Sequence, residues 1–262
     1  MAKFTPDPDR IIGGRVFTDI RDLPPRARRP RYYHPITKEE LPSVTTVLGV
    51  YPKPALVGWA RKDGLQRVIK YVTSQKRKRY TVAQVVEAVE ASKKWRGVTD
   101  PKDYGGDTHT AIQAFLETGK EPEDEEEFYV SFRAFMSWWI PRADGMEELH
   151  SEVVLWHPTS LYAGTADLIY KRNGRWFVLD FKTSNGTWDE MSLQVSAYAE
   201  AFKALMELED TVDCHVLRLG KTNAEFDPVT VKDPVDKSRM FVDGLNWYRS
   251  VQRLEKEGAW SD

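Results

Sequence analysis

An aspartate and a lysine stand two residues apart in Val178-Leu179-Asp180-Phe181-Lys182-Thr183, at the end of an apolar segment. Side chains alternate along a strand, so a strand here would place Asp180 and Lys182 on one face and Leu179 and Phe181 on the other. Such an acid and cation can bind a metal ion and stabilise charge that develops on a phosphate. An Asp-x-Lys triplet is expected by chance about once in this chain. Alone, therefore, it is equally consistent with a surface ion pair.

Two further acids precede this segment. Asp167 stands in Gly164-Thr165-Ala166-Asp167-Leu168-Ile169, and Glu152 comes directly before Val153-Val154-Leu155. Asn173-Gly174 is a two-residue hairpin signal, so we expect antiparallel strands that bring Asp167 toward Asp180. A carboxylate among apolar residues is costly to bury without a partner. Two or three carboxylates provide the hard oxygen ligands that suit Mg²⁺ or Mn²⁺.

A helical pattern over residues 190–207 carries Gln194 and Tyr198, which are four residues apart and share one face. One interpretation is the polar edge of an ordinary amphipathic helix. The position of this helix directly after Asp180 and Lys182 favours a functional role for the pair.

The elements that must position these residues change character near residue 150. Residues 43–148 predict helices, and Thr81 with Gln84 fits a capping box. Residues 149–262 predict three strands, a helix, two strands and a closing helix over 240–257. We therefore expect an α/β fold with a small mixed sheet flanked by helices. The expected domains are an extended basic arm (1–42) and a single domain (43–262), with a helical section (43–148) and a sheet-containing core (149–262).

Charge is distributed unevenly. Residues 1–100 hold 21 Lys and Arg against 10 Asp and Glu, and the remainder holds 17 against 30. A basic front section predicts a polyanionic partner, although solvated surface is the alternative. If the partner is a nucleic acid, the expected contributors to binding are Arg28, Arg29, Lys76, Arg77, Lys78 and Arg79. Tyr32, Tyr33 and Trp59 either stack on exposed bases or pack internally.

Composition limits the remaining classes. The chain has 262 residues, 41% of them hydrophobic, and no apolar stretch long enough to cross a membrane. The N-terminus lacks the apolar core of a signal peptide. The single cysteine, Cys214, excludes an internal disulfide and a four-cysteine cluster. We expect a soluble protein in the cytoplasm or in another intracellular compartment.

Together these motifs resemble the PD-(D/E)XK nuclease superfamily, in particular its RecB-like exonuclease branch. The resemblance is carried by Gly-Thr-Ala-Asp ending at Asp167, Leu-Asp-Phe-Lys-Thr around Asp180, and Gln194-x-x-x-Tyr198. Residues 105–112 resemble the helix of that branch that bears a metal-binding histidine, here His109. Residues 41–59 resemble the N-terminal segment of phage-type and mitochondrial genome maintenance exonucleases. The likeness spans about residues 32–250 and implies a restriction-endonuclease-like core.

The resemblance also implies roles for individual residues. The metal ligands would be His109, Asp167, Asp180 and the backbone carbonyl of Phe181. Lys182 would position or activate the attacking water, and Glu152 would support the metal shell. Gln194 and Tyr198 would orient Lys182 and the DNA backbone.

The function implied is that of an Mg²⁺- or Mn²⁺-dependent DNA exonuclease without an iron–sulfur cluster. Its substrate would be single strands or duplex ends in recombination, replication or repair, as in phage-type systems. The chain lacks a Gly-x-x-x-x-Gly-Lys-Ser/Thr phosphate loop, so unwinding would require a separate helicase. A single-strand annealing or binding protein is the other expected partner. The alternatives are a structure-selective endonuclease on the same fold and a nucleic-acid-binding module without catalysis.

Overall fold

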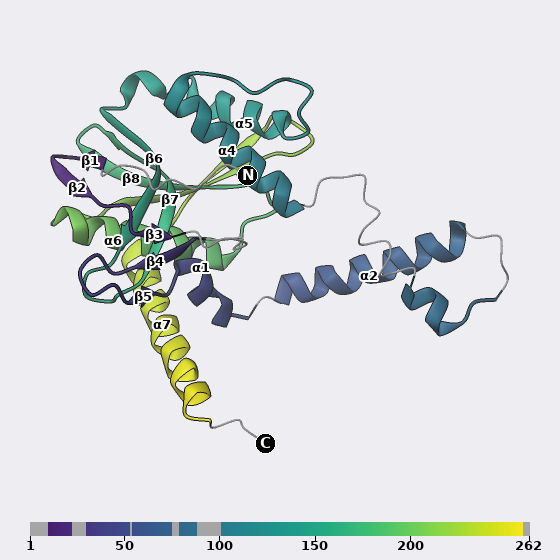
Figure 1. The fold of residues 1–262 in the computed structure, drawn as a ribbon. Helices are drawn as coiled ribbons and strands as arrows, with labels where there is room; N and C mark the ends of the chain where they lie inside the picture. The colour runs from purple at the N-terminus through teal and green to yellow at the C-terminus, as the bar shows by residue number, and fades with distance from the viewer. Residues whose placement is uncertain (1–9, 23–29, 53, 75–78, 88–100, 259–262) are drawn as a thin grey trace. The chain divides into compact units, whose positions relative to one another are not determined.

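The central sheet has five strands, shown in Figure 1. In a computed structural model of the chain, which describes residues 10–22, 30–52, 54–74, 79–87 and 101–258, their order is β10-β9-β8-β7-β6. Strands β8 and β9 are parallel, and the other neighbours are antiparallel. The bounds are β6 Glu148–Trp156, β7 Ala163–Arg172, β8 Arg175–Lys182, β9 Asp213–Leu219 and β10 Phe226–Thr230. The prediction of a small mixed sheet is confirmed.

The turn between β7 and β8 is the predicted two-residue hairpin. Asn173 and Gly174 have φ values of 52° and 73°, which suit a primed turn and favour Asn-Gly. Arg172 pairs with Arg175 across it. This turn fixes the register that places Leu168 opposite Leu179, one position from the two acids.

Helices cover both faces of the sheet (Figure 1). α6 Asp189–Met206 connects the parallel strands β8 and β9 and packs on one face with α7 Pro234–Lys256. The other face is covered by α5 Tyr129–Trp139 and by the residues of α4 Pro101–Thr118 that follow Gly105. The predicted alternation along β8 is confirmed, because Val178 packs on the α6 side and Leu179 and Phe181 on the opposite side.

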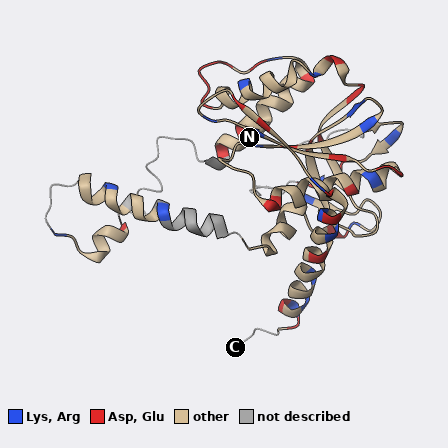
Figure 2. Cartoon of the chain, turned by 180° about the vertical axis from the view of Figure 1, so that it is seen from behind, with Lys and Arg blue, Asp and Glu red and all other residues tan. Residues whose placement is uncertain are grey.

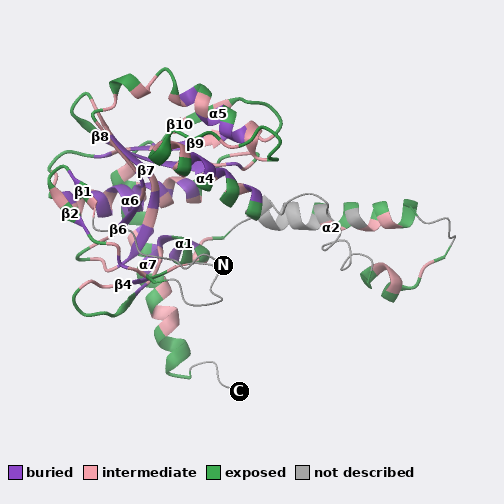
Figure 3. Cartoon of the chain, turned by 45° about the horizontal axis from the view of Figure 1, so that its top comes forward, coloured by how far each residue is buried: buried purple, intermediate pink, exposed green. Residues whose placement is uncertain are grey.

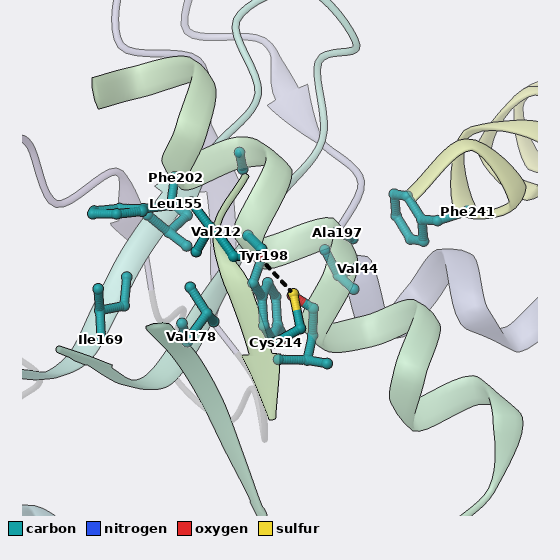
Figure 4. Packing of buried hydrophobic residues seen from close by; sticks show 14 of the residues in the cluster. Val44, Leu155, Ile169, Val178, Ala197, Tyr198, Phe202, Val212, Cys214 and Phe241 are labelled. Carbon is teal, nitrogen blue, oxygen red and sulfur yellow. Dashed lines mark hydrogen bonds between the residues drawn. The ribbon is translucent and has the colours of Figure 1, made fainter. Parts of the chain in front are cut away.

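The two cores lie between the sheet and these helices, where Figure 3 shows the buried residues. Figure 4 shows the core under α6, which contains the cysteine; its labelled members are Val44, Leu155, Ile169, Val178, Ala197, Tyr198, Phe202, Val212, Cys214 and Phe241. The thiol of Cys214 is 1% exposed. Burial raises its pKa to about 12, so it remains a packed, protonated thiol at neutral pH.

The described residues of the expected N-terminal arm form short strands. A hairpin pairs β1 Arg10–Ile12 with β2 Arg15–Phe17. A second small sheet contains β3 Arg21–Asp22, β4 Arg31–Tyr33 and β5 Glu40–Leu41. Ile12 and Phe17 enter the α6 core, and Tyr32 packs with Leu41, Val154 and Ala163. The buried side chains of Ile12, Phe17 and Tyr32 thus anchor this segment to the rest of the chain, and the domain boundary at residue 42 stays a prediction.

Short helices connect the small sheets to the rest of the chain. α1 Val44–Val47 begins after Pro42, as predicted, and the Ser43 hydroxyl accepts a hydrogen bond from the Thr46 N–H. The single-turn helix η1 Leu48–Val50 follows α1 directly. A second single-turn helix, η2 Ala143–Gly145, lies between α5 and β6. α7 begins six residues before the predicted start, because Pro234 is well suited to the first turn of a helix.

Residues 52–104 form a second compact unit. It contains α2 Pro54–Ser74 and a helix over residues 82–87. The predicted capping box is confirmed: the Gln84 N–H donates to Thr81 Oγ1 at 3.3 Å, and the Thr81 N–H donates to Gln84 Oε1 at 3.1 Å. Within this unit, the Tyr80 hydroxyl donates a hydrogen bond to the Val72 carbonyl on α2.

Charged side chains of both signs are interspersed over the surface, as along α7 in Figure 2. Of the residues assigned to DNA binding, Arg79 is exposed. Arg28, Arg29, Lys76, Arg77 and Lys78 lie outside the described residues, as does the side chain of Trp59. No helix in the described part of the chain is long and apolar enough to cross a membrane.

Candidate active site

A close contact between β7 and α6 sets one side of the site. A Cβ on Gly164 would lie 2.5 Å from Cε1 of Tyr198, so only glycine leaves room for this ring. Tyr198 is 3% exposed and accepts a hydrogen bond from Gln194 Nε2 at 3.1 Å. The same nitrogen donates to Asp180 Oδ1 at 3.1 Å. The predicted shared face of Gln194 and Tyr198 therefore contacts Asp180, whereas the expected contact was with Lys182, and the ring of Tyr198 is turned into the core.

Asp180 and Lys182 form a buried ion pair. The ammonium of Lys182 contacts Asp180 Oδ2, and the Asp180 side chain is 2% exposed. Burial raises the pKa of Asp180 to about 6, against the opposing effect of Lys182. Burial alone would lower the pKa of Lys182, but Asp180 and Asp167 outweigh it and raise this pKa above its ordinary value. Lys182 therefore remains a cation at neutral pH.

His109 and Asp167 meet beside this pair. His109 Nδ1 lies 3.3 Å from Asp167 Oδ1, and Asp167 Oδ2 accepts a 2.6 Å hydrogen bond from the Phe181 N–H. Gly105 lies one turn before His109, where an added Cβ would come 3.3 Å from Thr183 Oγ1 at the end of β8. This close approach lets α4 present His109 to the sheet. The resemblance assigned the Phe181 carbonyl to the metal. The hydrogen bond of the Phe181 N–H to Asp167 does not involve this carbonyl, so its role as a ligand stays a prediction.

Opposite charge shifts the pKa values of both groups. Burial disfavours the charged form of His109, but Asp167 outweighs this effect and raises the pKa of His109 to about 9. Burial disfavours the charged form of Asp167 as well, yet His109, Lys182 and the Phe181 N–H lower its pKa below the ordinary range. The metal-free site therefore holds a protonated imidazole against an ionised carboxylate.

Glu152 joins this pair through a break in β6. The register pairs Ser151 with Leu168 and Val153 with Ala166, but Glu152 and Asp167 between them do not pair. Glu152 has a φ of 50°, in the left-handed region that a non-glycine residue adopts at a free-energy cost. Burial, with Asp167 nearby, raises the pKa of Glu152 to about 7. Strain and a shifted pKa at one residue indicate a functional position.

His109, Glu152 and Asp167 form a group able to hold a metal ion. Each offers one ligand atom, and these atoms all lie within 4.8 Å of one another. One imidazole nitrogen and two carboxylate oxygens suit a divalent ion such as Mn²⁺ or Mg²⁺. The group contains two members of the predicted set and brings in Glu152, which was expected only to support the metal shell. Asp180 lies outside this group, in the pair with Lys182, so its role as a ligand stays a prediction.

Two residues near this group have no signal in the sequence. Arg10 and Arg21 both lower the pKa of Glu152 by their charge. They lie more than a hundred residues before it, in a segment without a recognisable motif. Only folding of the chain brings these two arginines close to Glu152.

The metal-free protein should lose stability as the pH rises from about 7 to about 9. The folded-state pKa values of His109 and Glu152, about 9 and about 7, exceed the ordinary values of 6.5 and 4.5. The pKa values of His150, His157 and His215 are lowered by burial, so above about pH 7 these histidines are neutral in both states. The folded chain therefore holds more protons than the unfolded chain between about pH 7 and 9. The contribution of His109 is complete below about pH 6.5 and is lost as the pH rises through about 9. Melting temperatures in EDTA across this range measure the effect.

Added Mg²⁺ should raise the melting temperature more at pH 8 than at pH 6, because binding must displace the proton on His109. His109→Gln should flatten both trends, and His34→Gln, which changes a histidine outside the group, should leave them intact. A metal-free melting temperature that increases between about pH 7 and 9 would contradict the raised pKa of His109.

Comparison with known proteins gives the site its context. A model of the PD-(D/E)XK nuclease superfamily matches residues 78–257. The crystal structure of SSO0001 is similar at 11% identity and a TM-score of 0.30, covering 71% of this chain and 83% of that one. The crystal structure of an alkaline exonuclease from Laribacter hongkongensis gives 11% and 0.31, covering 59% and 84%.

No curated protein matches the chain. The family match covers more than half of the chain, and it includes His109, Glu152, Asp167, Asp180 and Lys182. The chain therefore belongs to the PD-(D/E)XK nuclease superfamily.

Proposed function

We propose that the protein is a metal-dependent DNA exonuclease of the RecB-like branch, which hydrolyses phosphodiester bonds at DNA ends or in single strands. The observation that carries this proposal is the group of His109, Glu152 and Asp167 beside the Asp180–Lys182 ion pair. Membership of a nuclease superfamily makes nucleic acid the substrate. The histidine on α4 supports the RecB-like branch, because the resemblance assigns a metal-binding histidine to the corresponding helix.

The chain's own side chains perform three tasks in this reaction. His109, Glu152 and Asp167 would hold the divalent ion, Mg²⁺ or Mn²⁺. Lys182 offers a half-buried cation to the attacking water or to a phosphate oxygen. Asp180 holds the Lys182 ammonium in place, and Gln194 holds Asp180. When bound, the metal supplies Lewis acidity toward a phosphate oxygen and lowers the pKa of a water.

Partners and pathway follow from the expected chemistry. Processing of ends or single strands belongs to recombination, replication or repair, phage-encoded systems included. The ATP-driven opening of a duplex would come from a separate helicase, and a single-strand annealing or binding protein would present or protect the strand.

Replacement of Lys182 tests the proposed chemistry. Lys182→Gln removes the cation but none of the three grouped ligands, so it should lower the single-turnover rate by about 10²–10³-fold. Metal affinity should change little. The measurement is the cleavage of end-labelled linear DNA at saturating Mg²⁺ or Mn²⁺, with Lys171→Gln as the matched control. Lys171 also lies on the sheet, but its partner is Glu147 at 3.9 Å, away from the site.

The substrate then separates the candidate functions. An exonuclease should release nucleotides from linear DNA and leave covalently closed circles intact. Cleavage of the circle would favour the structure-selective endonuclease, and binding without cleavage would favour a non-catalytic module. An unchanged rate for Lys182→Gln would overturn the assigned role of the lysine.

The surplus of basic residues in the first hundred positions supports a DNA track that includes Lys76, Arg77, Lys78 and Arg79. Changing all four to Ala should reduce the slope of log affinity against log salt by about 0.7 for each phosphate of a single strand that the variant no longer neutralises. A matched control removes four exposed cations elsewhere: Lys232, Arg239, Arg253 and Lys256. Equal salt slopes for the two quadruple variants would show that the first run is ordinary solvated surface.

A further inference from the structure

The break in β6 at Glu152 is tied to the N-terminal hairpin. The guanidinium of Arg10, on β1, donates through Nη1 to the carbonyl of Ser151, the residue directly before Glu152. Arg10 Nη2 also lies 3.8 Å from Glu117 Oε1 on α4. Ser151 donates its own hydroxyl to that same oxygen at 3.3 Å. Arg10 therefore links the distorted part of the edge strand to the helix that carries His109.

A second arginine, Arg21, lies near Glu152. Arg21 Nε and Nη2 bond the carboxylate of Asp19 at 2.9 Å and 2.6 Å. The Arg21 and Asp19 side chains are only 12% and 5% exposed. Arg10, Asp19, Arg21 and Glu152 line one small pocket together with Phe17, Val153 and Val154. The largely buried Asp19–Arg21 pair thus lines the same pocket as Glu152.

From these contacts we infer that Arg10 and Arg21 are positioning residues, which hold Glu152 in the left-handed conformation that directs its carboxylate to His109 and Asp167. The inference rests on the metal site of the proposed function. A strained backbone persists only where its surroundings fix it. The neighbours within β6 do not do so, because the ladder to β7 is interrupted at Glu152. The N-terminal segment supplies the missing constraint and is therefore part of the active site.

A purely electrostatic role and a positioning role of the two arginines predict opposite effects on metal binding. A guanidinium beside the site repels a divalent cation, so its removal should tighten metal binding if charge were its only contribution. Asp19 already balances the charge of Arg21, and Glu117 lies against Arg10. If the arginines position Glu152, their removal should weaken binding, because the carboxylate is no longer held toward the other two ligands. The sign of the change therefore distinguishes the two roles.

The test measures Mn²⁺ affinity by calorimetry on the full-length protein, without DNA. Arg10→Gln and Arg21→Gln should each weaken binding by roughly tenfold or more, the size of effect expected for a residue that orients a ligand. Arg15→Gln is the matched control. It removes an arginine from the same hairpin, where Arg15 bonds Glu207 and the Leu205 carbonyl, away from Glu152. This control should bind Mn²⁺ like the unchanged protein.

A double-mutant cycle shows whether the arginines act through Glu152. In a Glu152→Gln background, Arg10→Gln and Arg21→Gln should cause little further loss of affinity. If a glutamine variant fails to fold, as judged by its metal-free melting, the lysine variant replaces it. Lysine retains the charge but lacks the planar fork of the guanidinium, so weaker binding is again the expected result.

The possible outcomes separate the two claims. Wild-type protein that binds no Mn²⁺ would overturn both the proposed function and this inference. Wild-type binding with unchanged or tighter binding in the arginine variants would overturn the inference and leave the proposed function standing. Full additivity in the cycle would also overturn it, because the arginines would then act independently of Glu152.

Discussion

The structure depends on the cost of burying several carboxylates on three neighbouring strands of one sheet. Glu152, Asp167 and Asp180 lie on neighbouring strands, and Asp167 raises the pKa of each of the other two. Like charges in a poorly solvated place repel one another, so the site is stable only where cations neutralise them. His109 supplies one cation toward Asp167, and Lys182 supplies another toward Asp180. A divalent ion would replace the proton on His109 and remove the remaining imbalance.

The elements around the sheet satisfy this requirement from several directions. Glycines allow the close approaches: Gly105 brings α4 toward the end of β8, and Gly164 admits the ring of Tyr198 from α6. The N–H of Phe181, on β8, donates to the carboxylate of Asp167 on the neighbouring strand β7. On the outer side, the N-terminal strands hold the break in β6. Residues that are far apart in the chain thus converge on the place where burial of charge is most costly.

Local patterns in the sequence predicted much of this arrangement. Alternation along β8 separated Asp180 from Phe181, Asn173-Gly174 set the hairpin, and helical spacing joined Gln194 to Tyr198. Each rule relates residues that are close in the chain. Glu152 as a member of the metal group could not be predicted this way, because it depends on one φ angle in an otherwise regular strand. Nor could the places of Arg10 and the buried Tyr32, since their contacts on β6 and β7 come from distant residues.

The most direct test of the account is the position of a metal ion in a crystal of the protein soaked with Mn²⁺. Anomalous diffraction at an energy where manganese scatters strongly locates the ion without reference to the protein. We expect a peak about 2.0–2.3 Å from one ligand atom each of His109, Glu152 and Asp167, which are the distances of direct ligands. A peak at ligand distance from Asp180 but not from Glu152 would contradict this assignment of the metal ligands. The absence of a peak near His109, Glu152 and Asp167 would contradict it as well.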